Sequence, residues 1–151
     1  MRRILGAIML ATMAHGAAAA QDDIMRMQAG GDVGATMDAL VEAVEGAGAT
    51  VFARVDHGAG AAGVDMDLAP SQLLIFGNPK LGTPPMQANA LAGLFLPLKV
   101  LVYEDGDGQV WLAYEDPEET LDDLEGIDDD AAYIQKMRMA LIKLTEAAAG
   151  R

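Results

Sequence analysis

Short apolar segments that end at turn residues fill the middle of the sequence and restrict the fold to one built around a sheet. Residues 99–104 and 109–114 are strand-like and are joined by Asp-Gly-Asp-Gly at 105–108, where glycine supplies the positive φ of a hairpin turn. A hairpin implies antiparallel pairing. The other segments expected as strands are 22–29, 50–55 and 71–76, and the last is apolar enough to be buried on both faces.

Two longer segments carry apolar residues at helical spacing. The first is expected to run from an N-cap at Asp32 to Gly46 and Gly48, and the last to begin at the acidic residues 128–130, whose charge suits a helix N-terminus. Their apolar stripes are Val33, Met37, Leu40, Val41 and Val44 in the first, and Ile134, Met137, Leu141 and Leu144 in the last. The order β-α-β-β-β-β-α predicts an α+β two-layer sandwich, with a mostly antiparallel sheet and both helices on one face.

The first twenty residues have the three parts of a secretory signal. Arg2 and Arg3 give a positive start, residues 4–13 are apolar, and residues 17–20 are all alanine. A membrane span needs roughly 20 apolar residues, and the apolar run here is interrupted early. We therefore expect residues 1–20 to be a cleaved signal peptide and residues 21–151 to form one soluble domain. That domain would be periplasmic or secreted, with no membrane contact after cleavage.

Charge and composition exclude several kinds of partner and chemistry. The full chain has a net charge of −13, which repels nucleic-acid phosphates and anionic lipids, so we expect neither as a partner. The chain has no cysteine, which excludes disulfides and thiol catalysis. An exported domain without disulfides depends on its apolar core, and 52% hydrophobic residues can supply one.

Three segments together resemble the family called domain of unknown function 302: residues 54–57 (Arg-Val-Asp-His), 76–87 and 96–102. The middle segment carries the most specific elements, which are Phe-Gly-Asn-Pro, Gly-Thr and a methionine. The resemblance covers nearly all of residues 21–151. It implies a two-layer sandwich similar to the TATA-binding-protein-like fold, and a homodimer, but no established function. The run 115–130, with ten acidic residues, is more acidic than the family leads one to expect and is interpreted as a solvated loop.

His57 and Asp56 are the candidate catalytic residues. His57 is the only histidine outside the expected signal peptide, and it directly follows Asp56 at the end of an expected strand. A histidine held by a carboxylate can act as an acid or base near neutral pH. The structural alternative is that both side chains only make hydrogen bonds to the adjoining loop.

The stretch 77–97 is expected to be a long irregular connection, and such loops are often functional. Asn78, Lys80 and Thr83 bring an amide, an ammonium and a hydroxyl together among glycines, a set that could bind a small anion or carboxylate. Met86 lies in the same stretch, and Lys99 follows it as a possible partner for a ligand or for an acid. The structural alternative is a set of turns stabilised by proline, glycine and an Asn cap.

Three functions therefore stay open. The first is a non-enzymatic exported protein, either small-ligand-binding or accessory, with a site formed by His57, Asn78, Lys80, Thr83, Met86 and Lys99. The second is an enzyme that uses His57 and Asp56 as acid and base, and the third is a structural or interaction domain. One histidine without cysteine cannot build the usual zinc site, and methionines more often fill cores than bind Cu(I). The sequence predicts no metal site and identifies no cofactor.

Overall fold

The chain folds into five strands with helices between them, and the computed structural model describes residues 24–128 and 130–151. The strands are β1 (Ile24–Gln28), β2 (Thr50–Asp56), β3 (Ser71–Gly77), β4 (Leu98–Glu104) and β5 (Val110–Glu115). The helices are α1 (Val33–Gly46), α2 (His57–Ala62), α3 (Pro79–Ala88), the 3-10 helix η1 (Ala90–Leu94), α4 (Pro117–Leu121) and α5 (Ala132–Ala148). The strands form one sheet in the order β1-β5-β4-β3-β2, and every neighbouring pair is antiparallel.

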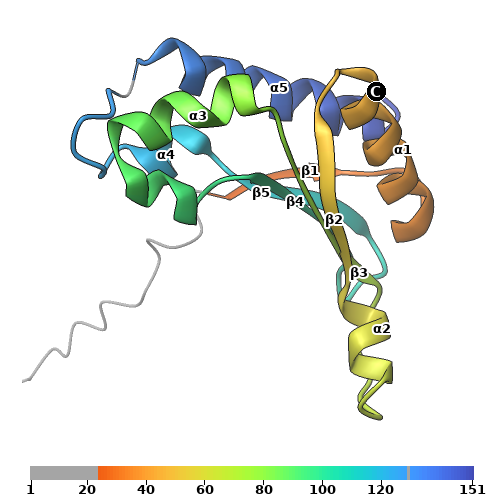
Figure 1. Cartoon of the computed structure of the whole chain (residues 1–151). Coiled ribbons are helices and arrows are strands. Elements are labelled where there is room, and N and C mark those ends of the chain that lie inside the picture. Colours follow the sequence, from red (N-terminus) through yellow and green to blue (C-terminus); the bar gives the residue numbers. More distant parts are fainter. Residues whose placement is uncertain (1–23, 129) are drawn as a thin grey trace, which may run out of the picture.

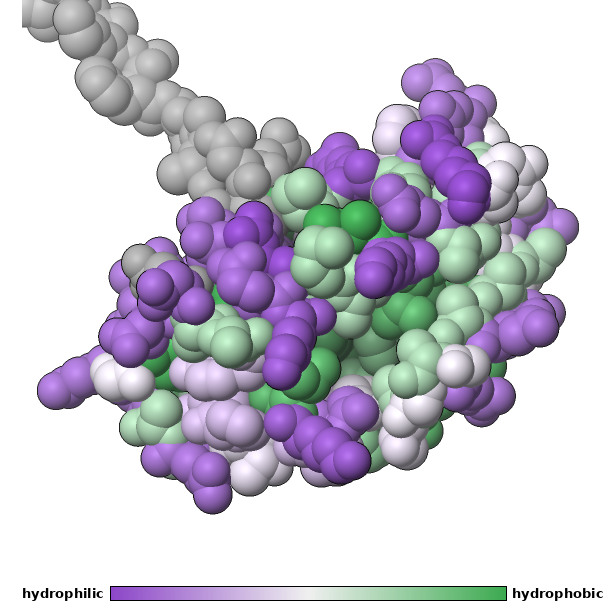
Figure 2. All heavy atoms as spheres, turned by 90° about the horizontal axis from the view of Figure 1, so that it is seen from above, coloured by the Kyte–Doolittle hydropathy of each residue, from purple (hydrophilic) through white to green (hydrophobic). Residues whose placement is uncertain are grey.

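The long helices α1 and α5 lie on one side of the sheet, together with α3 (Figure 1). Leu74, Val100 and Leu112 come from three adjacent strands and share one fully buried cluster with Leu40 of α1 and Leu141 of α5. Burial of each such side chain contributes about 1.5–3 kcal/mol. The expected two-layer sandwich and its β-α-β-β-β-β-α framework are therefore confirmed. Seen from the helical side, the surface combines hydrophilic groups with apolar patches (Figure 2).

The opposite side of the sheet, which we call the open face, is not covered by α1, α3 or α5 (Figure 1). The strand register places Val55, Leu73 and Leu101 in one row across it. The expectation that residues 71–76 are buried on both faces is therefore wrong. Leu74 is fully buried, whereas its neighbour Leu73 points to the open face and is half-buried.

The connection at residues 77–97 is helical, which corrects the expectation of an irregular loop. Asn78 Oδ1 accepts a hydrogen bond of 3.0 Å from the backbone N–H two residues on, and Pro79 occupies the first helical position, where its missing N–H costs little. Pro84 and Pro85 would normally interrupt a helix. Pro85 is buried, and α3 packs against α5 and η1, so tertiary contacts outweigh the cost of the prolines.

The acidic run is more ordered than a solvated loop over its residues 115–128. It contains α4, whose N-cap Asp116 accepts a hydrogen bond of 3.0 Å from the backbone two residues on. Leu121 and Ile127 are buried in a second apolar cluster beneath this segment. The last helix begins at Ala132 rather than at the acidic residues, and its N-cap makes no side-chain hydrogen bond.

Residues 57–70, which we call the arm, leave the sheet after β2 and return at β3. Helix α2 begins at His57, because the preceding Asp56 Oδ1 accepts a 2.8 Å hydrogen bond from the Ala59 N–H and so caps the helix. No residue of α2 is buried. The arm extends past the end of the sheet and away from the helical layer (Figure 1).

The expected signal peptide, residues 1–20, lies outside the described residues. Within residues 24–128 and 130–151, no helix combines the length and the apolar character that a membrane crossing requires.

Candidate functional site

A cavity of about 190 Å³ lies where the end of β3 meets α3 and α5. Asn78 and Thr83 are the only residues with polar side chains among the described residues that line it. The lining residues are Phe52, Gly77, Asn78, Pro79, Leu81, Gly82, Thr83, Met86, Leu96, Pro97, Leu98 and Met137. Because an apolar cavity of about 150 Å³ can hold benzene, this volume fits a compact molecule of similar size.

Phe52 reaches the cavity because β2 contains a bulge. The register with β3 shifts between Val51 and Ala53, which leaves Phe52 as the extra residue of the edge strand. A Cβ atom placed on Gly77 would lie 3.3 Å from the Phe52 ring, so glycine at this position lets the ring approach the end of β3. The Phe52 side chain is 55% exposed and therefore forms an outer wall of the cavity.

Met86 packs against two glycines. A Cβ atom on Gly82 would lie 3.7 Å from Met86 Cε, and one on Gly93 would lie 3.6 Å from Met86 Sδ. Met137 of α5 is 1% exposed and contributes a second thioether to the same cavity. Thioether side chains are flexible and polarisable, which suits them to apolar ligands of varied shape.

Three of the six predicted ligand-binding residues line this cavity. They are Asn78, Thr83 and Met86, which belong to α3 or cap it. Lys80 is on the same helix but is exposed and does not line the cavity. The positive charge expected at this site is therefore not part of its wall.

His57 and Lys99 lie elsewhere. His57 begins the arm, at the opposite end of β2 from the cavity, because β2 and β3 are antiparallel. The seven residues of β3 separate the two ends by about 20 Å. Lys99 lies on the open face, where its Nζ is 3.2 Å from Glu115 Oε2. The structure therefore does not join the His57 strand end to the Asn78–Met86 segment in one site.

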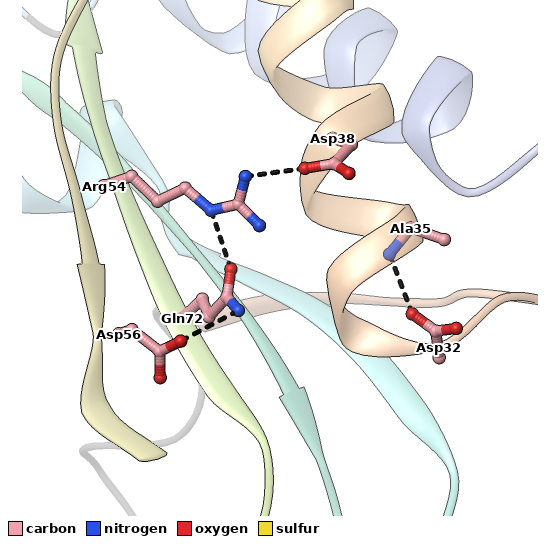
Figure 3. Close-up of polar contacts among 6 residues, drawn as sticks. All are labelled: Asp32, Ala35, Asp38, Arg54, Asp56 and Gln72. Carbon is pink, nitrogen blue, oxygen red and sulfur yellow. Dashed lines mark hydrogen bonds and ion pairs between the residues drawn. The ribbon is translucent and has the colours of Figure 1, made fainter. Parts of the chain in front are cut away.

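Asp56 belongs to a chain of polar contacts that joins the edge strand to α1 (Figure 3). Its Oδ1 accepts from the Ala59 N–H at 2.8 Å, and its Oδ2 accepts from Gln72 Nε2 at 3.2 Å. Gln72 Oε1 accepts from Arg54 Nε at 2.8 Å, and Arg54 Nη1 is 2.6 Å from Asp38 Oδ1. Both carboxylate oxygens of Asp56 thus have structural partners, which matches the structural alternative for this residue.

The sequence did not point to three of the cavity residues. Met137 was interpreted only as part of a core stripe, Phe52 lies inside an expected strand, and Leu98 entered only through the family resemblance. The bulge and the packing of α3 on α5 bring them together, and neither has a local sequence signal. Among the described residues, no group of three His, Cys, Asp or Glu side chains is placed to hold a metal ion.

These features define a small α+β domain with one helical layer on an antiparallel sheet and an apolar cavity at the sheet end. The chain belongs to the family described as "Domain of unknown function DUF302", whose model matches residues 25–145. The fold is also similar to the crystal structure of an uncharacterized conserved DUF302 protein from Bacillus stearothermophilus, with a TM-score of 0.71. That match covers 83% of this chain and 98% of the other at 19% identity, so it shows the fold alone.

Part of the chain is also similar to proteins that are named as ion channels. It is 46% identical over 85 residues to proteins named fluoride-specific ion channel FluC 1 from Brucella suis biovar 1 (strain 1330) and Brucella abortus biovar 1 (strain 9-941). The match covers 56% of this chain but only 34% and 32% of those proteins. The chain therefore spans about a third of the length of the curated relatives it matches.

Proposed function

We propose that this chain is an exported domain that binds a compact, uncharged, apolar molecule in the cavity beside α3. The observation that carries the proposal is the chemistry of the cavity wall. Phe52, Met86 and Met137 offer aromatic and thioether surface, and polar contacts are limited to Asn78 and Thr83. A charged ligand would lose its hydration without gaining a counter-ion, since no described lining residue is charged. The wall thus favours a neutral ligand over a small anion or carboxylate.

The ligand-binding test uses neutral probes of benzene size, namely indole, toluene and cyclohexanol. Binding is measured by ligand-observed NMR and by the rise in the thermal unfolding midpoint, because a ligand that binds only the native state stabilises it. We expect saturable binding of at least one probe. Native mass spectrometry of the protein purified from the exported fraction is expected to show a retained small molecule.

The matched variants are Gly82→Leu and Gly46→Leu. A Cβ atom on Gly82 makes only ordinary contacts with Met86 and Leu96, so the backbone tolerates it while the rest of the leucine fills the cavity. A Cβ atom on Gly46, at the end of α1, has no described atom within 4 Å. We expect Gly82→Leu to abolish probe binding and Gly46→Leu to preserve it. Failure of every probe to bind the wild type, or equal binding to both variants, would contradict the proposal.

The position of His57 argues against acid–base catalysis at the cavity. Asp56 is occupied by Ala59 and Gln72, and His57 is exposed and about 20 Å from the cavity along β3. An acid–base pair would need both groups within hydrogen-bond reach of a bound substrate. We expect His57→Ala to leave probe binding unchanged. A loss of probe binding in that variant would revive a role for His57 in the site.

Export and a homodimer are parts of the same proposal. Export is supported by the basic, apolar and small-residue pattern of residues 1–20, and the homodimer by the family resemblance. Intact mass measurement of the protein from a periplasmic extract is expected to give a chain that begins at Gln21. Detection of only the full-length chain in the cytoplasmic fraction would contradict export.

An accessory role beside a membrane channel is a second candidate. It is favoured by the similarity to proteins named fluoride-specific ion channels, which this chain matches over about a third of their length. A net charge of −13 opposes fluoride binding by the domain itself, so the role we propose is contact with a channel rather than capture of the ion. The test compares growth in fluoride with and without the gene, and titrates the purified domain with fluoride by ¹⁹F NMR. Normal growth of the deletion strain would remove this candidate.

A further inference from the structure

Asn78 joins β3 to α3 and lines the cavity. Its Oδ1 accepts a hydrogen bond of 3.0 Å from the Lys80 N–H, and its backbone carbonyl accepts from the N–H groups of Leu81 and Gly82 at 2.9 and 3.0 Å. Pro79 has no N–H to offer. Within the first turn of α3, which the structure describes completely, no backbone N–H is therefore left to bind an anion.

The cap also fixes which end of the Asn78 amide remains for a ligand. An amide accepts through its oxygen and donates through its nitrogen, so the hydrogen bond at Oδ1 leaves the two N–H groups of Nδ2. Among residues 24–128 and 130–151, no group accepts a hydrogen bond from this nitrogen. Because Asn78 is half-buried, an unpaired donor is costlier here than at an exposed position.

Asn89, the only other asparagine of the chain, caps η1 in the same way but uses both ends of its amide. Its Oδ1 accepts from the Leu91 N–H at 3.0 Å, and its Nδ2 donates to the Glu125 carbonyl oxygen at 3.1 Å. Asn89 does not line the cavity. Of the two asparagines, the one whose amide nitrogen has no described partner is thus the one beside the cavity.

The other polar group of the wall is the Thr83 hydroxyl. Thr83 is exposed, so water at the cavity mouth can satisfy it. Pro79, Gly82, Thr83 and Met86 recur at i, i+3, i+4 and i+7, which places them on one face of α3. The wall therefore combines one half-buried donor, at Asn78, with a largely apolar surface.

We propose that the ligand of the cavity carries a carbonyl oxygen that accepts a hydrogen bond from Asn78 Nδ2, and a compact apolar body that packs against Met86 and Met137. The proposal rests on the ligand-binding function proposed above and specifies its ligand class, a neutral ketone or aldehyde of about benzene size. Nδ2 only donates, so an oxygen that only accepts is its complement, whereas a hydroxyl would need a second partner for its proton. A carboxylate would accept as well, but no described lining residue offers a counter-ion.

The test measures the dissociation constants of three probes of similar size, cyclohexanone, cyclohexanol and toluene, by ligand-observed NMR titration of the purified protein. Asn78→Ser keeps an oxygen that can cap α3 but removes the amide nitrogen. We expect it to weaken cyclohexanone binding about three- to tenfold, the change that corresponds to one net hydrogen bond. Asn78→Asp keeps the cap and the shape but exchanges the donor for an acceptor, and should weaken cyclohexanone binding at least as much. Toluene makes no such hydrogen bond and should bind the wild type and Asn78→Ser alike.

The matched control is Asn89→Ser, the same change at the cap outside the cavity, which should leave the binding of all three probes unchanged. Failure of every probe to bind the wild type would overturn the ligand-binding function itself. If toluene binds, but Asn78→Ser leaves cyclohexanone binding unchanged or weakens both probes equally, the ligand-binding function stands and the role of the Asn78 donor is overturned. A greater loss for cyclohexanol than for cyclohexanone would overturn the carbonyl class in favour of an alcohol.

Discussion

Replacement of Leu74 by alanine should remove a large part of the stability of this domain. Leu74 lies at the centre of β3, is fully buried, and shares the core cluster with α1 and α5. Leucine-to-alanine changes at such positions cost about 3–5 kcal/mol, from lost transfer free energy and from the cavity that remains. Domains of this size have about 5–15 kcal/mol to lose. We therefore expect a folded but strongly weakened variant.

The matched control is Leu73→Ala, one residue earlier on the same strand. Leu73 points to the open face and is half-buried, so we expect a loss of about 1 kcal/mol in the monomer. Urea unfolding, followed by far-ultraviolet circular dichroism and by the fluorescence of the single tryptophan, Trp111, measures both free energies. The comparison cancels backbone and strand-propensity effects, because the two substitutions are chemically identical.

Equal losses for Leu73→Ala and Leu74→Ala in dilute protein would refute one-sided burial of the sheet.

Three further changes test local contacts. Arg138→Ala removes the cation that lies 2.9 Å from Asp116, whose side chain is 13% exposed. It should lower the free energy of unfolding, measured in urea, by about 1–2 kcal/mol. An unchanged urea midpoint would contradict a stabilising role for this pair. Burial raises the pKa of the Tyr114 phenol above 10.0. The stability that the neutral phenol contributes is therefore complete below pH 10 and is lost as pH rises through the folded-state pKa. Tyr114→Phe should abolish this alkaline loss of stability in thermal scans. The hydrogen bond from the Gln109 backbone N–H lowers the pKa of Asp105 below 3.8. The stability that the Asp105 carboxylate contributes is therefore present above pH 3.8 and is lost as pH falls through the folded-state pKa. Asp105→Asn should therefore be less stable than wild type at neutral pH, with a difference that shrinks in acid.

The secondary structure could be predicted where the pattern is local. The apolar stripe of α1 and the Asp-Gly-Asp-Gly turn at 105–108 are periodicity and turn-chemistry signals, and they gave the correct framework. Helix α3 was missed because Pro84 and Pro85 indicate a break, and only packing against α5 overrides them. The uncovered side of β3 was missed because an apolar run does not reveal whether a second layer exists.

The strand topology explains why only part of the candidate site, the residues of α3 and its cap, was predicted. Residues that follow β2 and residues that follow β3 come to the same edge of a sheet only if the two strands are parallel. Here they are antiparallel, so His57 and Asn78 lie at opposite ends. The antiparallel pairing expected from the sequence already implies that His57 and Asn78 lie at opposite ends of the sheet. The bulge at Phe52 and the approach of Met137, in contrast, depend on three-dimensional packing and have no counterpart in the sequence pattern.

The cavity and the arm are linked by the same two strands, and this makes their independence testable. β2 and β3 run from the arm at one end to Phe52 and Gly77 at the other, a distance of about 20 Å along β3. Sites separated by more than about 10 Å usually act additively within about 0.5 kcal/mol. We expect Gly82→Leu to abolish probe binding, Met66→Asp in the arm to leave probe binding unchanged, and the effects of the two changes on the free energy of unfolding to add in the double variant. A coupling free energy above that limit would mean that β2 and β3 transmit a change in the arm to the cavity.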